Sequence, residues 1–301
     1  MGKEKRVIAL GFFDGVHLGH AALLARTKER ALELDAKPSV LTFDTHPGQI
    51  VSTKPVPLIN APEGRVDLLE RLYDIHDVLF LHFDTRMRQM AWADFVTALQ
   101  GEFGAVHVVC GHNFRFGYGG QGTAALLAEK CQALGMGCDV IEEVAIAGEA
   151  VSSTHIRKLL QTGEIEAANR FLGHPHTLVD TVRHGYKLGR TLGAPTINMQ
   201  FPKGVLELPH GVYATRVTIG DEVHFAVTNI GTRPTVAGGD RVTVESYILD
   251  FDADLYGQRV RVEFFRYLRP EMKFDGVEAL KTQIQRDAEA TRVWFGESGI
   301  K

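Results

Sequence analysis

Cysteine is scarce in this sequence of 301 residues, which contains only Cys110, Cys131 and Cys138. Their odd number and their spacing argue against a disulfide framework or a zinc-binding pair, so we interpret them as ordinary cytosolic thiols. No apolar run approaches the length that spans a bilayer, and residues 1–6 lack the apolar stretch of a signal peptide. We therefore expect a cytoplasmic protein that does not bind membranes.

Positive charge is not in excess either, because the formal net charge is −4. A basic surplus is needed to neutralise nucleic-acid phosphates, so we expect no nucleic-acid partner. The sequence also lacks a helix-linked phosphate loop with the ending Gly-Lys-Ser/Thr, and it has no internal repeat or low-complexity segment. Its 45% apolar content is enough for one large core or two modest ones, as in a soluble enzyme.

The character of the sequence changes near residue 175. Before this point, apolar strands alternate with amphipathic helices, which is typical of a parallel sheet covered by helices. The expected strands are 7–10, 39–43, 78–81, 105–110 and 138–141, and the expected helices are 21–34, 64–75, 92–100, 124–134 and 151–160. After this point, about six short strands separated by glycine turns indicate a small antiparallel barrel, with one packed helix at about 277–294. We therefore expect an α/β domain over residues 1–175 and a barrel domain over residues 176–301.

The most informative segment is GFFDGVHLGH at residues 11–20, between an expected strand and an expected helix. A glycine turn in this position binds nucleotide phosphates in α/β proteins. The residues expected to form the turn are Gly11, Phe13, Gly15 and Gly19. His17 and His20 would point the same way from the first helical turn, where two imidazole donors suit the charge that develops on an attacked phosphorus. The alternative is a tight turn with two exposed histidines. The segment resembles the HxGH signature of nucleotidyltransferases.

Two further segments follow strands of the first half. Asp44 and His46 emerge at the carboxyl end of a strand, where ligands collect in open sheets, although Asp44 alone is also a common turn former. Asn113, Phe114 and Phe116 follow a later strand in the same way. Their rings could stack on a flat heterocycle while the amide forms hydrogen bonds. The alternative places both phenylalanines in the core.

Three consecutive hydroxyl residues, Ser152, Ser153 and Thr154, open the helix at 151–160. Helix capping alone explains one of them. Together with Arg157 one turn further on, they predict a cradle for a triphosphate.

The second half has its own group of candidate residues. Gly189 and Arg190 lie in a glycine-rich, basic segment that predicts a flap over ATP. Thr196 and Asn198 share one face of the strand that follows, and oxygen ligands of this type suit Mg²⁺, which keeps several waters. Glu245 is a lone carboxylate on a strand, and its spacing alone favours a solvent-facing residue.

Nine segments run in a fixed order along the chain. They are GFFDGVHLGH, TFDTHP, GHNFRFG and VSSTHIR in the first half, and GRTLGAPTIN, LPHGVYA, NIGTRPT, VESYILDFDADLYG and LRPEMKF in the second. In this order, and over nearly the whole length, the chain resembles the prokaryotic bifunctional riboflavin kinase/FAD synthetases. The resemblance implies a Rossmann-like nucleotidyltransferase domain followed by a flavokinase barrel.

The resemblance also implies two reactions that each use ATP. In the barrel, riboflavin is phosphorylated to FMN, with Glu245 as the catalytic base and Mg²⁺ held by Thr196 and Asn198. In the first domain, FMN attacks the α-phosphate of a second ATP, giving FAD and pyrophosphate, while His17, His20 and Arg157 stabilise the transition state. The expected partners are these small-molecule substrates alone, and we expect a monomer or a weak oligomer.

The sequence departs from the family pattern in two places. Thr45 replaces a proline that is common in the family, while Asp44 and His46 are retained. Residues 118–123 lack the basic residues and the Gly-Asp pair that many members carry, which could weaken the adenylyl step. Two other hypotheses therefore stay open. One is a flavokinase whose first domain adenylates poorly or uses another substrate, and the other is a flavin- or RNA-binding regulator.

Overall fold

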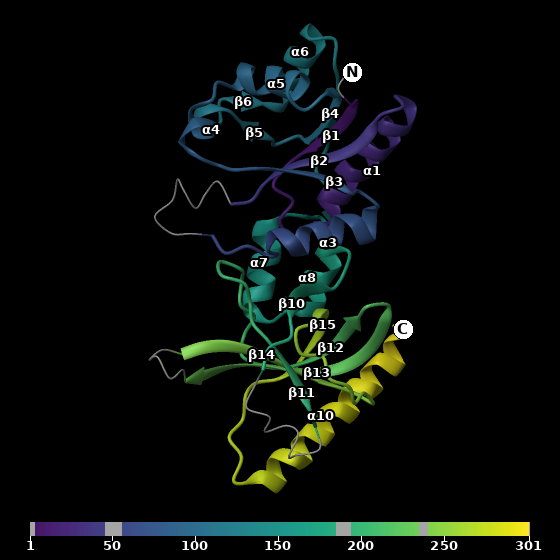
Figure 1. Ribbon diagram of the computed structural model, residues 1–301, viewed down its shortest axis with the longest axis vertical. Coiled ribbons are helices and arrows are strands. Elements are labelled where there is room, and N and C mark those ends of the chain that lie inside the picture. The colour runs from purple at the N-terminus through teal and green to yellow at the C-terminus, as the bar shows by residue number, and fades with distance from the viewer. Residues whose placement is uncertain (1–3, 46–55, 185–193, 235–239, 301) are drawn as a thin grey trace. The chain divides into compact units, whose positions relative to one another are not determined.

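The computed structural model describes residues 4–45, 56–184, 194–234 and 240–300, and the chain forms two compact units (Figure 1). The first unit comprises Met1–Leu58 and Arg65–Ser153, and the second comprises Ile59–Gly64 and Thr154–Lys301. A short segment from the first third of the chain therefore belongs with the second unit. The helices between residues 153 and 172 also cluster mainly with that unit.

The first unit is built on a five-stranded parallel sheet in the order β3-β2-β1-β4-β7. The strands are β1 (Arg6–Leu10), β2 (Lys37–Phe43), β3 (Asp77–Leu81), β4 (Ala105–Gly111) and β7 (Gly137–Ile141). The helices between them are α1 (Leu18–Glu33), α3 (Pro62–Tyr73), α4 (Thr85–Gln89), α5 (Trp92–Gly101) and α6 (Ala124–Ala133). The parallel, helix-covered sheet predicted from the sequence is confirmed.

Both faces of this sheet are covered, because alternate residues of its central strand enter different cores. Ile8 and Leu10 pack with residues of α5 and α6, whereas Val7 and Ala9 pack with residues of α1 and α3. All four side chains are almost completely buried. A strand that is buried on both faces must be apolar throughout, which explains the unbroken apolar run at residues 7–10.

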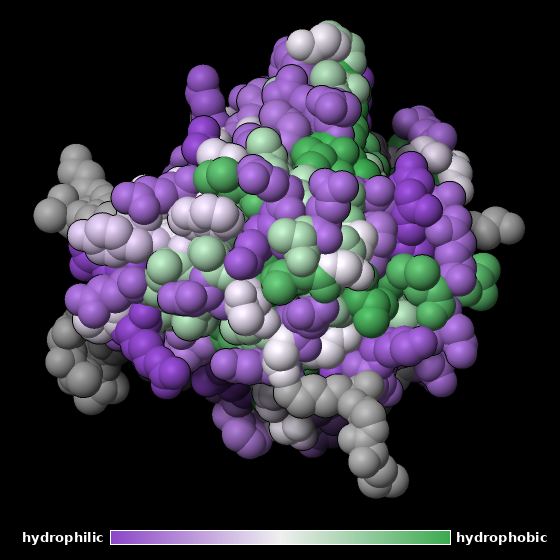
Figure 2. Space-filling model, turned by 90° about the horizontal axis from the view of Figure 1, so that it is seen from above, coloured by the Kyte–Doolittle hydropathy of each residue, from purple (hydrophilic) through white to green (hydrophobic). Residues whose placement is uncertain are grey.

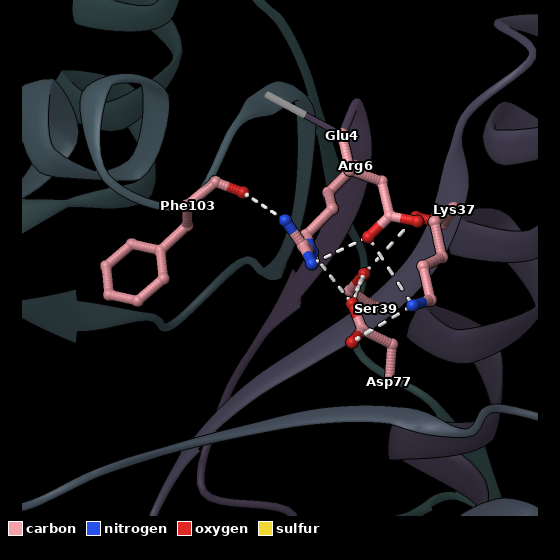
Figure 3. A network of polar contacts seen from close by, with 6 residues as sticks. All are labelled: Glu4, Arg6, Lys37, Ser39, Asp77 and Phe103. Carbon is pink, nitrogen blue, oxygen red and sulfur yellow. Dashed lines mark hydrogen bonds and ion pairs between the residues drawn. The ribbon is translucent and has the colours of Figure 1, made fainter. Parts of the chain in front are cut away.

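A network of charged residues joins the amino ends of three neighbouring strands (Figure 3). The Arg6 guanidinium donates to Asp77 at 2.8 Å and to the carbonyl of Phe103 at 3.1 Å. Asp77 also accepts from the Ser39 hydroxyl at 2.6 Å and pairs with Lys37 at 3.5 Å. This network stabilises one end of the sheet, and the opposite, carboxyl end carries the candidate functional loops.

Two short hairpins and two further helices complete this part of the chain. The hairpins are β5 (Arg115–Phe116) with β6 (Gly122–Thr123), spanned by the 3-10 helix η1 (Tyr118–Gly120), and β8 (Ala145–Ile146) with β9 (Glu149–Ala150). The helices are α7 (Ser153–Thr162) and α8 (Ile165–Leu172).

The second unit contains a six-stranded antiparallel sheet in the order β10-β15-β12-β13-β14-β11. The strands are β10 (His176–Thr181), β11 (Thr196–Met199), β12 (Gly211–Ile219), β13 (Glu222–Pro234), β14 (Asp240–Ile248) and β15 (Arg259–Arg269). The two edge strands of this sheet, β10 and β11, come together, because the amide of Arg183, just after β10, donates to the carbonyl of Asn198 on β11 at 2.9 Å. Asp180 also accepts from the Gln200 amide at 3.0 Å. The sheet thus curls into the small barrel that the sequence predicts.

Helix α10 (Val277–Ser298) packs on the outer face of β12 and β13. Its Ala288 lies in a cluster with Val212 and Val227, and the Phe295 ring stacks on Phe225 with centroids 4.1 Å apart. The predicted C-terminal helix is confirmed and extends four residues beyond its expected end.

On the face seen in Figure 2, hydrophilic residues cover most of the surface and hydrophobic residues form small, separate groups. Among the helices that the described residues form, none combines the length and the apolar character that a membrane-spanning helix requires.

Candidate functional site

The loop between β1 and α1 places two histidines at a helix N-terminus. His17 is the N-cap of α1, and its Nδ1 accepts from the His20 amide at 3.3 Å. The two imidazole rings stack with centroids 3.6 Å apart and an interplanar angle of 14°. The first amides of a helix lack partners within the helix and attract anions, so both rings lie where a phosphate would bind.

The backbone of this loop is strained at non-glycine residues. Phe13 has a φ of 55° and Val16 a φ of 41°, and both side chains are fully buried. A β-branched residue rarely adopts a positive φ, and such strain is typical of functional sites, where the surrounding structure holds it. A Cβ at Gly19 would lie 3.1 Å from the His17 ring, so a larger residue there would displace that ring by a few tenths of an ångström.

His20 has a buried Nδ1 atom without a hydrogen-bond partner among the described residues. Burial lowers the pKa of His20 well below its usual value, and the neighbouring His17 and Arg65 lower it further. The ring is therefore neutral near pH 7. A neutral imidazole carries one N–H group, so it can still donate a hydrogen bond to a phosphate oxygen.

The predicted hydroxyl cluster falls on both sides of the division between the units. In the first unit, the Ser153 hydroxyl donates to the carbonyl of Asp14 at 2.9 Å, which ties the start of α7 to the β1–α1 loop. Ser152 is half-buried in the same unit. Thr154 and Arg157 belong to the second unit, where Thr154 is exposed and Arg157 is only 9% exposed.

Arg65 on α3 contacts the β1–α1 loop, and the sequence analysis did not predict this contact. Its buried guanidinium donates to the carbonyls of Phe12 at 2.8 Å and Phe43 at 2.9 Å, and to the Thr42 hydroxyl at 3.0 Å. Its Cζ lies 4.6 Å from the centre of the Phe12 ring. The residue thus joins the loops that follow β1 and β2, and no local pattern in α3 indicates these long-range bonds.

Asp44 lies just beyond β2 and accepts from Nδ1 of His82, just beyond β3, at 2.9 Å. Burial alone would raise the pKa of Asp44, but hydrogen bonds from His82 and Thr45 outweigh burial and lower it. The same hydrogen bond raises the pKa of His82. The sequence did not single out His82, and His46 lies outside the described residues.

The two candidate phenylalanines in the loop after β4 differ in how deeply their side chains are buried. Phe116 is 8% exposed and belongs to the core, packing against Phe95 with ring centroids 5.4 Å apart. Phe114 is partly buried and stacks on Phe116, with centroids 5.3 Å apart. Asn113 lies in the turn that the Phe114 amide closes by donating to the carbonyl of Gly111 at 3.0 Å. The burial of Phe116 leaves little of its ring for a ligand, as the packing alternative expects.

In the second unit, strand register aligns three polar residues on neighbouring strands. Asn198 of β11 lies opposite Glu245 of β14, and Glu245 lies opposite Asn229 of β13. Directly opposed residues share one face of a sheet, so the three side chains form a row. The Thr243 hydroxyl donates to Oε1 of Glu245 at 3.4 Å. Asn229 lies in NIGTRPT, but only the register shows that it neighbours Glu245.

A second carboxylate lies beside this row. Oε1 of Glu271 approaches Gly231 so closely that a Cβ at Gly231 would overlap it, and Oε2 lies 3.6 Å from Nδ1 of His210. The segment that carries Glu271 follows Arg269, whose guanidinium pairs with Asp287 of α10 at 2.7 Å. Helix α10 therefore anchors one end of the segment at the candidate site.

Thr196 and Asn198 are two residues apart on β11 and hence on one face of the sheet. The Asn198 amide nitrogen donates to the carbonyl of Thr196 at 3.4 Å, which leaves its Oδ1 as a ligand atom. The Thr196 hydroxyl and the Asn198 amide oxygen form a pair of oxygen donors that fits Mg²⁺, a cation that usually takes few protein ligands and keeps several waters. Within the part of the chain that the structure describes, no group of three or more His, Cys, Asp or Glu residues could hold a metal ion.

A hollow of about 50 Å³ borders Thr196, between β11 and the segment that follows β14. Asp252 and Asp254 contribute to its lining, and the ring of Tyr256 lies 3.9 Å from that of His184. Gly189 and Arg190, predicted as an ATP flap, lie outside the described residues.

Comparison with known proteins assigns both halves of the chain. Residues 1–155 match the family model for FAD synthetase, and residues 172–295 match the model for riboflavin kinase. A bifunctional riboflavin kinase/FMN adenylyltransferase of Pseudomonas fluorescens is 37% identical over 289 residues, which cover 95% of this chain and 92% of that protein. The protein of the same name in Listeria monocytogenes is 34% identical over 294 residues, covering 97% and 93%.

A solved structure shares the fold over nearly the whole chain. The crystal structure of a protein from Streptococcus pneumoniae, described as a macrolide-efflux protein, matches with a TM-score of 0.84 and 27% identity, covering 97% of this chain and 95% of that one. With matches to both family models and relatives of more than 30% identity over nearly its whole length, the chain belongs to the bifunctional riboflavin kinase/FMN adenylyltransferase family.

Proposed function

We propose that this chain phosphorylates riboflavin to FMN in its second unit and adenylates FMN to FAD in its first unit, with ATP as co-substrate in both reactions. Membership of the family supports both activities. The observation that carries the proposal is that each unit holds its own group of reactive side chains: the stacked histidines at the start of α1 in the first, and the row of Asn198, Glu245 and Asn229 in the second.

In the kinase step, the terminal ribityl hydroxyl of riboflavin attacks the γ-phosphate of ATP. Glu245 accepts the hydroxyl proton as the O–P bond forms, and ADP leaves. Asn229, directly opposite Glu245, is placed to orient that carboxylate or the hydroxyl. Thr196 and Asn198 would hold Mg²⁺, which when bound offsets the charge of the phosphates. Positioning and electrostatic stabilisation supply most of the acceleration in phosphoryl transfer.

In the adenylyl step, the FMN phosphate is the nucleophile, and it is already ionised at neutral pH, so no protein base is needed. It attacks the α-phosphate of ATP, and the bond to pyrophosphate breaks. His17, His20 and the amides at the start of α1 donate to the phosphate oxygens as charge builds on them. The residues proposed to bind the departing pyrophosphate are Ser152, Ser153, Thr154 and Arg157.

The flavin of FMN would bind at the carboxyl ends of β2 and β4. The predicted residues are Asp44, His46, Asn113, Phe114 and Phe116. Among the described ones, Phe114 offers the more accessible ring and Asp44 is held by His82. Phe116 would contribute by supporting the Phe114 ring on which it stacks.

We also propose that the protein acts in the cytoplasm as a monomer or a weak oligomer, without a nucleic-acid or membrane partner. The three cysteines are free thiols, which fits a reducing compartment. The net charge of −4 offers no surplus for binding nucleic-acid phosphates.

The test is to incubate the purified protein with riboflavin, ATP and Mg²⁺ and to separate the flavins by chromatography while measuring pyrophosphate. The proposal predicts that FMN forms first, and that FAD and pyrophosphate then form in equal amounts. FMN without FAD would leave only the kinase, the outcome expected if the uncharged loop at residues 118–123 impairs adenylation. Unchanged riboflavin would contradict the proposal as a whole.

A further inference from the structure

A carboxylate that the proposed kinase mechanism does not use lies beside the row of polar residues on the barrel. Glu271 belongs to the segment between β15 and α10, and its Oε1 occupies the space that a Cβ at Gly231 would need. Nδ2 of Asn229 lies 3.3 Å from the position of that Cβ. Asn229 and Gly231 are two residues apart on β13, so they share one face of the sheet. Glu271 therefore lies over the face that carries the row.

Contacts on both sides hold this carboxylate in place. Its other oxygen, Oε2, lies 3.6 Å from Nδ1 of His210, the residue just before β12. The His210 carbonyl accepts from the Tyr267 hydroxyl at 3.2 Å. On the other side, Arg269 pairs with the buried Asp287 of α10 at 2.7 Å and fixes the start of the segment. His210 thus engages one oxygen of Glu271, and the other oxygen lies beside Gly231.

The strand order shows what lies on each side of Glu245. The strands β11, β14, β13 and β12 are neighbours in that order across the sheet. Thr196 and Asn198, the proposed Mg²⁺ ligands, lie on β11, and the hollow that borders Thr196 is on the same side. The phosphates of ATP therefore belong on the β11 side of Glu245. Glu271 lies over β13, on the opposite side, with His210 at the start of β12.

The chemistry of phosphoryl transfer assigns the β13 side to the nucleophile. The attacking and leaving oxygens lie roughly in line, so the molecule that supplies the hydroxyl extends away from ATP. With its terminal hydroxyl at Glu245, riboflavin would extend its ribityl chain over β13, and that chain carries three further hydroxyl groups. An ionised carboxylate only accepts hydrogen bonds, and it repels phosphate oxygens. The charge of Glu271 therefore suits a neutral polyol and disfavours ATP.

We propose that Glu271 binds the ribityl hydroxyls of riboflavin through Oε1, and that His210 positions this carboxylate from its other oxygen. The proposal rests on the kinase function proposed above. Gly231 admits the carboxylate, because any side chain there would displace it. Glu271 thereby selects flavins that carry a polyol chain. Since it acts away from the reacting atoms, it contributes to flavin binding more than to the chemical step.

The test is steady-state kinetics of the full-length protein with two flavins. One is riboflavin, and the other is the flavin whose side chain is ω-hydroxypentyl, which keeps the terminal hydroxyl and lacks the other three. E271Q should raise the KM for riboflavin by about 10–100-fold, the usual effect of losing hydrogen bonds to a charged group. The kcat should change little, and the KM values for ATP and for the hydroxypentyl flavin should not change.

Two further variants test the surroundings of the carboxylate. G231A should raise the KM for riboflavin as E271Q does, because the added Cβ displaces Oε1. G296A on α10 is its matched control and should have no effect, since a Cβ there meets no atom within 4 Å. H210A should raise the same KM by a smaller factor and leave kcat unchanged. An unchanged KM in H210A would show that His210 does not position Glu271.

Three results would overturn the role given to Glu271. The KM for riboflavin does not change in E271Q, or it rises equally for both flavins, or the KM for ATP rises in its place. If the wild type forms no FMN, the proposed kinase function fails, but this proposal can still be tested. Quenching of flavin fluorescence on binding then compares the affinities of both flavins for the wild type and E271Q, and an unchanged preference for riboflavin contradicts the proposal.

Discussion

The imidazole rings of His17 and His20 stack in parallel, 3.6 Å apart, while Nδ1 of His17 accepts the His20 amide. One residue therefore caps α1 and also fixes the other ring over the helix N-terminus. The stacking and the cap bond hold both rings in place at the helix N-terminus, as electrostatic stabilisation by preorganised donors requires.

The first prediction concerns His20. H20A should lower FAD formation from FMN by about 10²–10³-fold, because it removes a donor that acts on charge developing in the transition state. FMN formation from riboflavin should not change, since the kinase residues lie in the second unit. Chromatography of both products checks this, and a thermal melt of the same preparation is the control. A lower melting temperature with unchanged turnover would show that His20 is only structural.

The second prediction concerns Glu245, which lies between Asn198 and Asn229 in the barrel row. E245Q should reduce FMN formation by about 10²–10⁴-fold, the usual effect of losing a positioned base. Adenylation of supplied FMN should persist. E222Q, at an exposed site at the start of β13, is the control and should leave both rates unchanged. FMN production by E245Q at the wild-type rate would exclude the role given to this carboxylate.

The third prediction concerns Arg65, which should contribute both to the stability of the fold and to the placement of the β1–α1 loop. R65M removes the donors to the carbonyls of Phe12 and Phe43, and we expect it to lower the free energy of unfolding by about 2–4 kcal/mol. FAD formation by the folded protein should also decrease, because the β1–α1 loop loses its link to β2. R71M on the same helix is the control and should cost less than about 0.5 kcal/mol. Urea unfolding and FAD assays of both variants test this prediction. If R65M and R71M had the same unfolding free energy and the same rate of FAD formation, the role given to Arg65 would be wrong.

His176 of β10 makes stability depend on pH. Burial lowers the pKa of His176 from 6.5 to about 3, with a smaller contribution from His174. Below pH 6.5 the unfolded chain takes up a proton that the folded chain does not, so stability is fully present above pH 6.5 and decreases as the pH falls toward 3. Between pH 7 and pH 5 the loss from this residue should be about 2 kcal/mol. H176Q should reduce this dependence of stability on pH, measured by urea unfolding at pH 7 and at pH 5.

The division of the chain can be tested with fragments. The sequence predicts that residues 1–175 and 176–301 fold separately. In the second unit, however, Asn169 of α8 accepts from the His176 amide at 2.7 Å and donates to the carbonyl of Phe264 at 2.8 Å. A fragment of residues 154–301 keeps these bonds, so we expect it to be more stable than residues 176–301 and to retain kinase activity. Equal urea midpoints for the two fragments would show that α7 and α8 are not needed by the barrel.

The sequence was most informative where the relevant interactions are local. The strand at 7–10, the glycine turn and the helix after it are close in the chain, and the structure places them nearly as expected, although α1 begins at Leu18 rather than at residue 21. The antiparallel barrel was also predictable, because alternation and glycine turns are local signals.

Residues that act through long-range contacts could not be predicted in this way. Arg65 reaches carbonyls 22 and 53 residues away, and His82 meets Asp44 from a different strand. The neighbours of Glu245 depend on strand register, which the sequence specifies only through the packing of the whole sheet. The positive φ values of Phe13 and Val16 contradict the preferences of these residues and are imposed by the surrounding structure.

The most direct test of two separate sites on one chain is a mixing experiment. E245Q and H20A are incubated with riboflavin, ATP and Mg²⁺, each alone and then together, and the flavins are separated by chromatography. E245Q alone should leave riboflavin unchanged, and H20A alone should stop at FMN. The mixture should make FAD, because FMN released by one variant is adenylated by the other. A mixture of folded variants that makes no more FAD than the two make separately would contradict the account.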